Sequence, residues 1–362
     1  MSNLYYRSPG IARSAAASPF VEAAAVDAWD AWFRWRDHGV LRDLTVDATW
    51  DRVAATLAAA ELHDATTWKR RFVDAFSAWQ LLPDERILAT AGTGKVGWHG
   101  DALAAVLNVA AFVRAPSALH GSFDHATFED VAALAVRALD NAAGLAGNDA
   151  ARGFRIGIVG LADAIALLDL DYDGDEGRAL AALVARSLGQ GCRRASSQLA
   201  YERGVTAPCS EAWRARALAQ EVATDIADAA ERIGIRHDRL TAIDSQSKLA
   251  LFANGVADAL DPLSSPPRPE HAPGSDPQRI ASAHHRPIRA AQGSSVDCAK
   301  SVAAQLKLRA AMRRWIDEPI GYPLLVDSEP SKLQSEQCSA MAEGLGLPRQ
   351  VGWRRPELRV HT

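Results

Sequence analysis

Apolar residues recur at helical spacing in several separate stretches of this chain. Between Trp50 and Leu57 they stand three and four positions apart, which places them on one face of a helix. Asp47 or Thr49 stands where a side chain could cap the start of this helix. A second amphipathic helix is predicted from about Asp64, and the aromatic rings that it carries at the same spacing are expected to lie in the core.

Other stretches predict further elements. The apolar run at 101–115 fits either a strand or a helix. Helical patterns follow at 123–143, 211–233 and 296–316, and LTAI at 240–243 predicts a short strand.

The most informative stretch begins at Arg152. A short run of branched apolar residues between glycines leads into GLAD, which opens a helix, and a second long helix follows an acidic loop. Arg155 stands within the predicted strand, and an arginine buried there would need a partner. The pattern therefore predicts an incomplete barrel in which this strand is partly exposed. Glycines fall where a strand-to-helix barrel needs tight turns and close backbone approach, namely at Gly157, Gly160, Gly174 and Gly204.

Helices come first along the chain and are followed by alternating strands and helices, which favours an α/β fold with a partial barrel. Segments rich in Pro, Ser, His and Arg without a period are expected to be solvated. The predicted regions are a flexible N-terminus at 1–24, a helical N-terminal domain at 25–94, a partial barrel at 101–262, a linker or insertion at 263–295, a C-terminal helix and strand of the barrel at 296–326, and a mostly irregular tail at 327–362.

Charge and composition exclude several classes of function. The formal net charge is -4 and the pI is about 6.2, so no basic surplus indicates binding to nucleic acid. No segment reaches the ~20 apolar residues that span a bilayer, and the N-terminus lacks the apolar core of a signal peptide. We therefore expect no membrane partner and a cytoplasmic location.

The cysteines are scattered without the spacing of metal ligands, so we expect reduced thiols and no metal site. They are Cys192, Cys209, Cys298 and Cys338. Two motif-like stretches also lack what their chemistry needs. AGTGK at 91–95 is followed by Val96, where a phosphate-binding loop needs the hydroxyl that holds magnesium. The acidic loop at 169–180 begins like a calcium loop, but Leu180 replaces the bidentate glutamate.

Several segments together resemble the large chain of ribonucleotide reductase. The stretch from Arg152 to Asp163 aligns without a gap with the family's RRIGLGVMGLAD, and SSQLAYERG continues the similarity. TWDRVAATLAAAE and LLPDERILATAGT resemble the N-terminal helical domain of the adenosylcobalamin-dependent class. LTAI, GVADALDPL and LRAAMRRWID are similar to later segments, so the motifs stand in the family's order over most of 45–262 and 296–326.

This resemblance implies a helical N-terminal domain followed by a partial, truncated ribonucleotide-reductase-type α/β barrel. It also implies reduction of ribonucleotides to deoxyribonucleotides for DNA synthesis, with adenosylcobalamin as the cofactor. No individual residue of this chain supports the cofactor.

The resemblance further predicts that a block of the barrel is missing. In the family, a long segment between AGAGT and NL.AFV carries the radical cysteine, its asparagine and glutamate neighbours, and one redox cysteine. Here Thr93 and Leu107 are joined by a short connection. The other redox cysteine, which the family places a few residues before the position of Asn108, is also absent. No residue is therefore assigned a catalytic role.

The family's substrate-phosphate loop, APTGTIS, aligns with the stretch from Asp244 to Ala250. The family places a glycine turn and hydroxyl groups ahead of a helix N-terminus, where backbone N–H groups hold the phosphate. Asp244 would repel a phosphate at this position. Ser245, Ser247 and Lys248 are the residues predicted to bind it here.

These observations predict a ribonucleotide reductase large-chain-like protein that is catalytically degenerate. One alternative is a non-catalytic binding or assembly partner of a full-length reductase. Another is one half of a split reductase, in which a second chain supplies the missing block. The expected partners are nucleotides or a full-length reductase chain.

Overall fold

The computed structural model describes residues 19–99, 102–115, 121–148, 151–263, 302–326, 328, 330–349 and 352–354. The helices are α1 (Ala23–Trp32), α2 (Val46–Ala58), α3 (Ala65–Ser77), α4 (Glu85–Thr90), α5 (His125–Leu145), α6 (Leu161–Leu167), α7 (Asp175–Arg203), α8 (Glu211–Ala219), α9 (Thr224–Ile233), α10 (Ser247–Phe252), α13 (Val302–Met312) and α14 (Lys332–Gly344). The strands are β1 (Arg36–Asp37), β2 (Val40–Leu41), β3 (Leu81–Pro83), β4 (Ala104–Asn108), β5 (Val113–Arg114), β6 (Ser122–Phe123), β7 (Gly153–Val159), β8 (Arg239–Thr241), β9 (Leu324–Leu325) and β10 (Trp353–Arg354). Two 3-10 turns are η1 (Val109–Phe112) and η2 (Arg313–Trp315).

The largest sheet has the strand order β3–β4–β7–β8. β3 runs antiparallel to β4, whereas β4, β7 and β8 are parallel. Gly157 lies so close to β8 that an added Cβ would stand 2.6 Å from the carbonyl oxygen of Ala242, so this approach requires glycine. The expected α/β class is confirmed. Across the described ranges this sheet stays open and does not close into a barrel.

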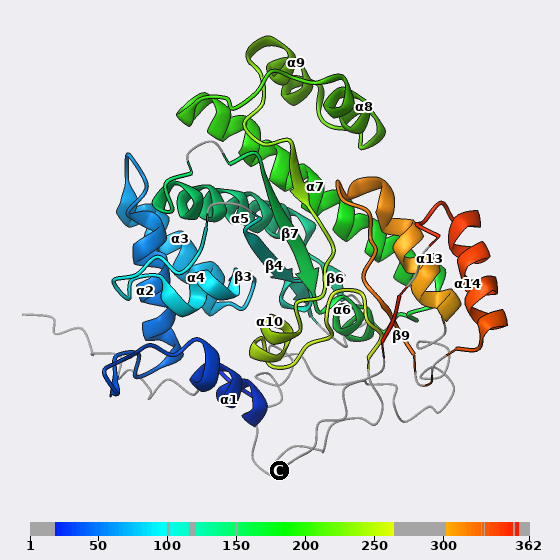
Figure 1. Ribbon diagram of the computed structural model, residues 1–362, viewed down its shortest axis with the longest axis horizontal. Coiled ribbons are helices and arrows are strands. Elements are labelled where there is room, and N and C mark those ends of the chain that lie inside the picture. Colours follow the sequence, from blue (N-terminus) through cyan, green and yellow to red (C-terminus); the bar gives the residue numbers. More distant parts are fainter. Residues whose placement is uncertain are drawn as a thin grey trace, which may run out of the picture.

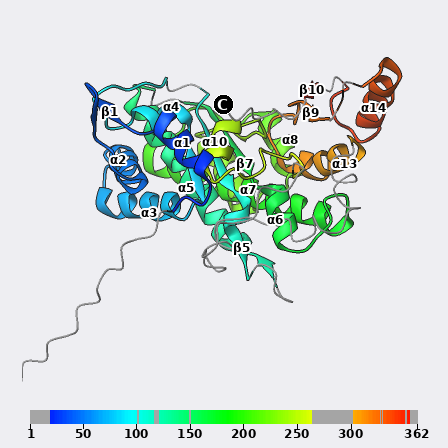
Figure 2. The same cartoon turned by 90° about the horizontal axis from the view of Figure 1, so that it is seen from below.

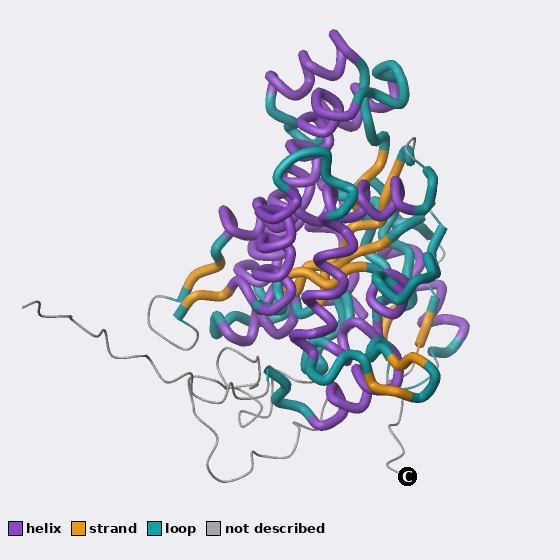
Figure 3. The backbone as a smooth tube through the Cα atoms, turned by 90° about the vertical axis from the view of Figure 1, so that its left-hand side faces the viewer, coloured by secondary structure: helices purple, strands orange, loops and turns teal. Residues whose placement is uncertain are grey.

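α5 and α7 pack side by side against one face of the sheet (Figures 1 and 2). An added Cβ at Gly191 of α7 would stand 2.3 Å from the carbonyl oxygen of Glu129 on α5, so the two helix backbones touch there. At the far end of α7 the chain turns into α8 and α9, which project beyond the sheet at the top of Figure 3.

Both faces of the central strands are buried. Successive residues of a strand point to opposite faces, so Val106 and Val159 share one face and Leu107 and Ile158 the other. None of these four side chains is more than 1% exposed. The face turned away from α5 and α7 is therefore packed and does not line an open channel.

The N-terminal helices share one hydrophobic core with the sheet. Phe252, at the end of α10, is fully buried among rings of the N-terminal segment. Its ring centroid lies 4.9 Å from that of Phe33, 5.3 Å from that of Trp50 and 5.1 Å from that of Trp79. Within residues 25–94 the helices α1 to α4 are interrupted by the β1–β2 hairpin and by β3, and a separate N-terminal domain stays a prediction.

Two local predictions are wrong in detail. The cap of α2 is Thr45, whose hydroxyl accepts the N–H of Ala48, and neither Asp47 nor Thr49 has this role. The single helix predicted at 211–233 is two helices, because the chain turns between α8 and α9. Glu221 adopts a left-handed conformation in that turn, with φ 51°.

The tail at 327–362 was predicted to be mostly irregular, but its described part contains the regular helix α14. α14 begins with a capping box, in which Ser331 and Gln334 each bond the other's backbone N–H. Its buried residues pack in a small core with α13, and β10 pairs with β9. The pattern is weak because only a narrow stripe of α14 is buried. Most of the predicted linker at 263–295 lies outside the described residues.

Candidate functional site

The loop after β8 contains the residues predicted to hold a phosphate. The Ser245 hydroxyl donates to one carboxylate oxygen of Asp258 at 2.5 Å, and the Gln246 backbone N–H donates to the other at 2.6 Å. Asp258 is only 8% exposed. A carboxylate accepts the same charge-assisted hydrogen bonds that a phosphate would. Asp258 therefore already satisfies two donors of this loop from within the chain.

Asp244, the first residue of this loop, is neutralised by Arg155 of β7. The guanidinium donates two parallel hydrogen bonds to the carboxylate, at 2.7 and 2.8 Å. The Asp244 carboxylate raises the pKa of Arg155. The Arg155 side chain is 39% exposed, whereas most of the other residues of β7 are buried, so the partial exposure predicted for this strand is limited to its first residues. Arg155 and Asp244, which each depart from the family's pattern in the sequence, thus neutralise each other's charge.

Lys248 points to a different partner. Its Nζ lies 3.0 Å from a carboxylate oxygen of Glu85 on α4 and 5.6 Å from the ring centroid of Trp32. Ser247 is the exposed first residue of α10. The three predicted phosphate-binding residues therefore do not converge on one point, since Ser245 and Lys248 each engage a separate carboxylate.

A buried network of charges lies behind the sheet, centred on Asp140 of α5. Its carboxylate accepts hydrogen bonds from Arg203 at 2.5 Å and from Arg236 at 2.7 Å, and His237 Nε2 lies 3.2 Å away. Burial alone would raise the pKa of Asp140, but the hydrogen bonds from His237 and Arg236 outweigh it and hold that pKa well below its usual range. Asp140 therefore remains ionised and ties α5 to α7 and to the segment before β8.

The network continues to α2. Glu61 just beyond α2 accepts a hydrogen bond from Arg203 at 2.8 Å, and the Arg137 guanidinium lies 3.3 Å from Glu61. Arg137 also pairs with Glu202 of α7. Burial lowers the pKa of Arg137, opposed by the two carboxylates. The sequence alone did not predict this network. Charged residues such as Arg137 and Asp140 on the buried face of a long amphipathic helix were the signal that could have found it.

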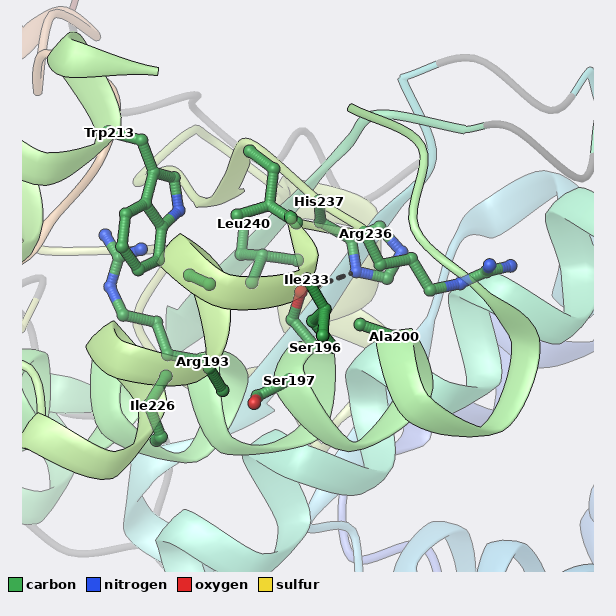
Figure 4. A pocket seen from close by; sticks show the side chains of 14 residues that line it. Arg193, Ser196, Ser197, Ala200, Trp213, Ile226, Ile233, Arg236, His237 and Leu240 are labelled. Carbon is green, nitrogen blue, oxygen red and sulfur yellow. Dashed lines mark hydrogen bonds between the residues drawn. The ribbon is translucent and has the colours of Figure 1, made fainter. Parts of the chain in front are cut away.

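Ser196, His237 and Asp140 form a hydrogen-bonded series. Figure 4 shows the contact between Ser196 and His237. His237 Nδ1 lies 3.0 Å from the Ser196 hydroxyl. Such a series resembles a hydrolase triad. However, Ser196 lies within α7, where backbone N–H groups are bonded along the helix and none can stabilise an oxyanion. The adjacent cavity measures about 20 Å³, which is room for a single water. The series therefore has a structural role.

A second buried cluster closes the outer edge of β8. The carboxylate of Asp317 accepts the backbone N–H groups of Leu240 and Thr241 at 2.9 and 3.2 Å. The side chains of Arg193 on α7 and of Gln220 donate hydrogen bonds to the other oxygen of this carboxylate. The Asp317 side chain thus accepts hydrogen bonds from backbone N–H groups of β8 that would otherwise be left for a further strand.

The described cysteines lie on three different segments. Cys192 is fully buried in α7, and burial raises the pKa of its thiol strongly. Burial also raises the pKa values of the Cys209 and Cys338 thiols. Thiol chemistry requires the thiolate, so this environment disfavours it. Cys298 lies outside the described residues.

Where the structure describes side chains, no three His, Cys, Asp or Glu residues gather as metal ligands. Nor is any helix in the described part of the chain long and apolar enough to cross a membrane.

The three parallel strands of the sheet and the long helices α5 and α7 lie in a segment that matches a known family. Residues 102–250 match the family model of the ribonucleotide reductase barrel domain. Over this segment, which includes β4, α5, β7, α7 and β8, the chain is similar to that barrel domain. No curated protein matches the chain. The resemblances predicted at 45–94 and 296–326 lie outside the matched residues and stay predictions.

Proposed function

We propose that this chain is a catalytically degenerate relative of the ribonucleotide reductase large chain, from the adenosylcobalamin-dependent class, that has lost the central block of the barrel. The observation that carries this proposal is the loop after β8. Its hydroxyl and backbone donors are engaged by Asp258, its first residue by Arg155, and its lysine by Glu85. A substrate phosphate would have to displace these partners.

The thiols support the same conclusion. Ribonucleotide reduction needs a cysteine radical and two further thiols that supply electrons at one site. The described cysteines lie on α7, on the segment before α8 and on α14, and two of them are buried. None can therefore act together with another at the loop after β8.

The short connection between α4 and β4 argues against the split-reductase alternative. Trp98 in this connection is 3% exposed, and its indole N–H donates to the carbonyl oxygen of Ala142 on α5 at 2.8 Å. Trp98 thus anchors the connection to α5, although most residues between Gly92 and His99 are exposed. Because both faces of the central strands are also buried, a second chain would have to unfold this packing to insert the missing block.

Adenosylcobalamin is implied by the resemblance alone, and the described residues do not fit it. The face of the sheet that would line a barrel is filled by buried side chains, and Phe252 closes the space between α10 and the N-terminal helices. We therefore assign no residue to this cofactor.

The test is an assay of ribonucleotide reduction by the purified chain with adenosylcobalamin, a dithiol and each of the four ribonucleotides. We expect no deoxynucleotide above a blank without cofactor, while an active reductase in parallel confirms the reagents. Clear turnover by this chain would overturn the proposal.

An assembly role is the alternative function, and it has its own test. The chain would be mixed at micromolar concentration with a full-length adenosylcobalamin-dependent reductase and examined by size-exclusion chromatography. A complex would support a non-catalytic partner of the full-length reductase. Elution as two separate peaks would contradict the assembly role.

A further inference from the structure

A cavity of about 460 Å³ lies where β7 and β8 begin, and it is also lined by residues of the segment that precedes α8. This volume falls within the range of small-molecule sites, roughly 300–1,000 Å³. Its apolar wall includes Ile235 and Pro208, and its polar wall includes three arginines, Arg152, Arg155 and Arg239. The cavity lies at the opposite end of β8 from the loop at 244–250.

The arginines are brought together by strand register. Arg152 immediately precedes β7, Arg155 is the third residue of β7, and Arg239 opens β8 beside Gly153. Like charges on adjacent strands repel one another unless anions offset them. An arrangement of this kind therefore depends on the acidic groups that surround it.

The acidic groups of this cavity are already paired. Glu318 lies 2.9 Å from Arg239, and Asp238 lies 2.5 Å from Arg216. Arg155 is bound by Asp244, as described above. Arg152 is exposed, and within the described part of the chain no carboxylate forms an ion pair with it. Among the residues that the structure describes, no counter-charge therefore pairs with Arg152 at this cavity.

We propose that this cavity binds a small organic anion, with its carboxylate or phosphate group on Arg152 and a compact apolar body against Ile235 and Pro208. The guanidinium fork suits the planar, two-oxygen face of such a group. The apolar wall would exclude water from the body of the ligand. This site is independent of the proposed function. None of its lining residues belongs to the loop at 244–250, and the two regions are linked only because the lining residue Arg155 pairs with Asp244 of that loop.

Isothermal titration calorimetry of the full chain tests the proposal, with benzoate and phenyl phosphate as the probes and benzyl alcohol as the uncharged control. We expect saturable binding of at least one anion, with a Kd of about 1 mM or tighter, and no binding of benzyl alcohol. Binding of only one of the two anions supports the proposal and identifies the head group.

Variants locate the site. Arg152→Ala should weaken anion binding about tenfold, because a charged hydrogen-bond partner is lost, and Arg152→Lys should restore part of it. Arg70→Ala, which removes another exposed arginine on α3, is the matched control and should bind as the native chain does. The proposal is overturned if neither anion binds saturably, if Arg152→Ala binds normally, or if Arg70→Ala weakens binding equally.

Discussion

Replacing Asp140 by asparagine tests whether the buried network holds the fold together. The Asp140 side chain is 2% exposed and faces Arg203, Arg236 and His237 within 3.2 Å. Asp140→Asn keeps the shape of the side chain but removes the anion of the buried Arg236 guanidinium, while the partly buried Arg203 keeps Glu61 as a partner. Removing one partner of a buried ion pair costs about 3–5 kcal/mol. We expect a loss in that range in the free energy of unfolding.

The measurement is denaturant unfolding of both proteins at neutral pH, followed by tryptophan fluorescence. Asp130→Asn on the same helix is the matched control, because Asp130 pairs with Arg194 at 2.8 Å while its side chain is 69% exposed. An exposed pair contributes about 0–1 kcal/mol, so this control should lose little. If Asp140→Asn also loses less than about 1 kcal/mol, Asp140 is not the centre of a stabilising network and the reasoning is refuted.

Two further predictions concern the core and its response to pH. Phe252→Ala should lower the free energy of unfolding by about 3–5 kcal/mol, because it opens a cavity among the surrounding rings; a loss below about 1 kcal/mol in denaturant unfolding would show that α10 does not join the N-terminal helices to the sheet. Burial lowers the pKa of His237, so below about pH 6.5 the unfolded chain takes up a proton that the folded chain does not, and stability falls as the pH falls. His237→Gln should remove this contribution. Because burial raises the pKa of Asp261 to about 6 and produces the opposite slope in both proteins, the difference between native and variant unfolding free energies is the quantity to compare, and equal pH profiles would contradict the prediction.

Much of the local structure follows from the sequence, because local patterns depend on neighbours along the chain. The spacing from Trp50 to Leu57 places α2 correctly, and the glycine-bounded apolar run places β7 and the start of α6. The break between α8 and α9 was missed, since the helical period continues through it. At this turn the Gln220 side chain forms hydrogen bonds with Arg193 and Asp317, which lie far away along the chain.

In the candidate site, too, the sequence identified individual residues, whereas their partners became known only from the structure. The sequence alone identified Arg155 and Asp244 as residues that break the expected pattern, and it identified Ser245, Ser247 and Lys248 as the possible phosphate ligands. It did not pair Arg155 with Asp244 or predict the role of Asp258, because such partners lie far apart along the chain and meet only after the strands align.

The sequence by itself determined the position of α2 and β7 and the start of α6, and which family the middle of the chain resembles. Only the tertiary structure decided what the polar residues do. Hydrophobic periodicity is a local property, whereas the partner of a charge depends on which segments are packed together. Asp140 and Arg236, which are 96 positions apart, illustrate this, because burial makes their pairing necessary and only the fold makes it possible.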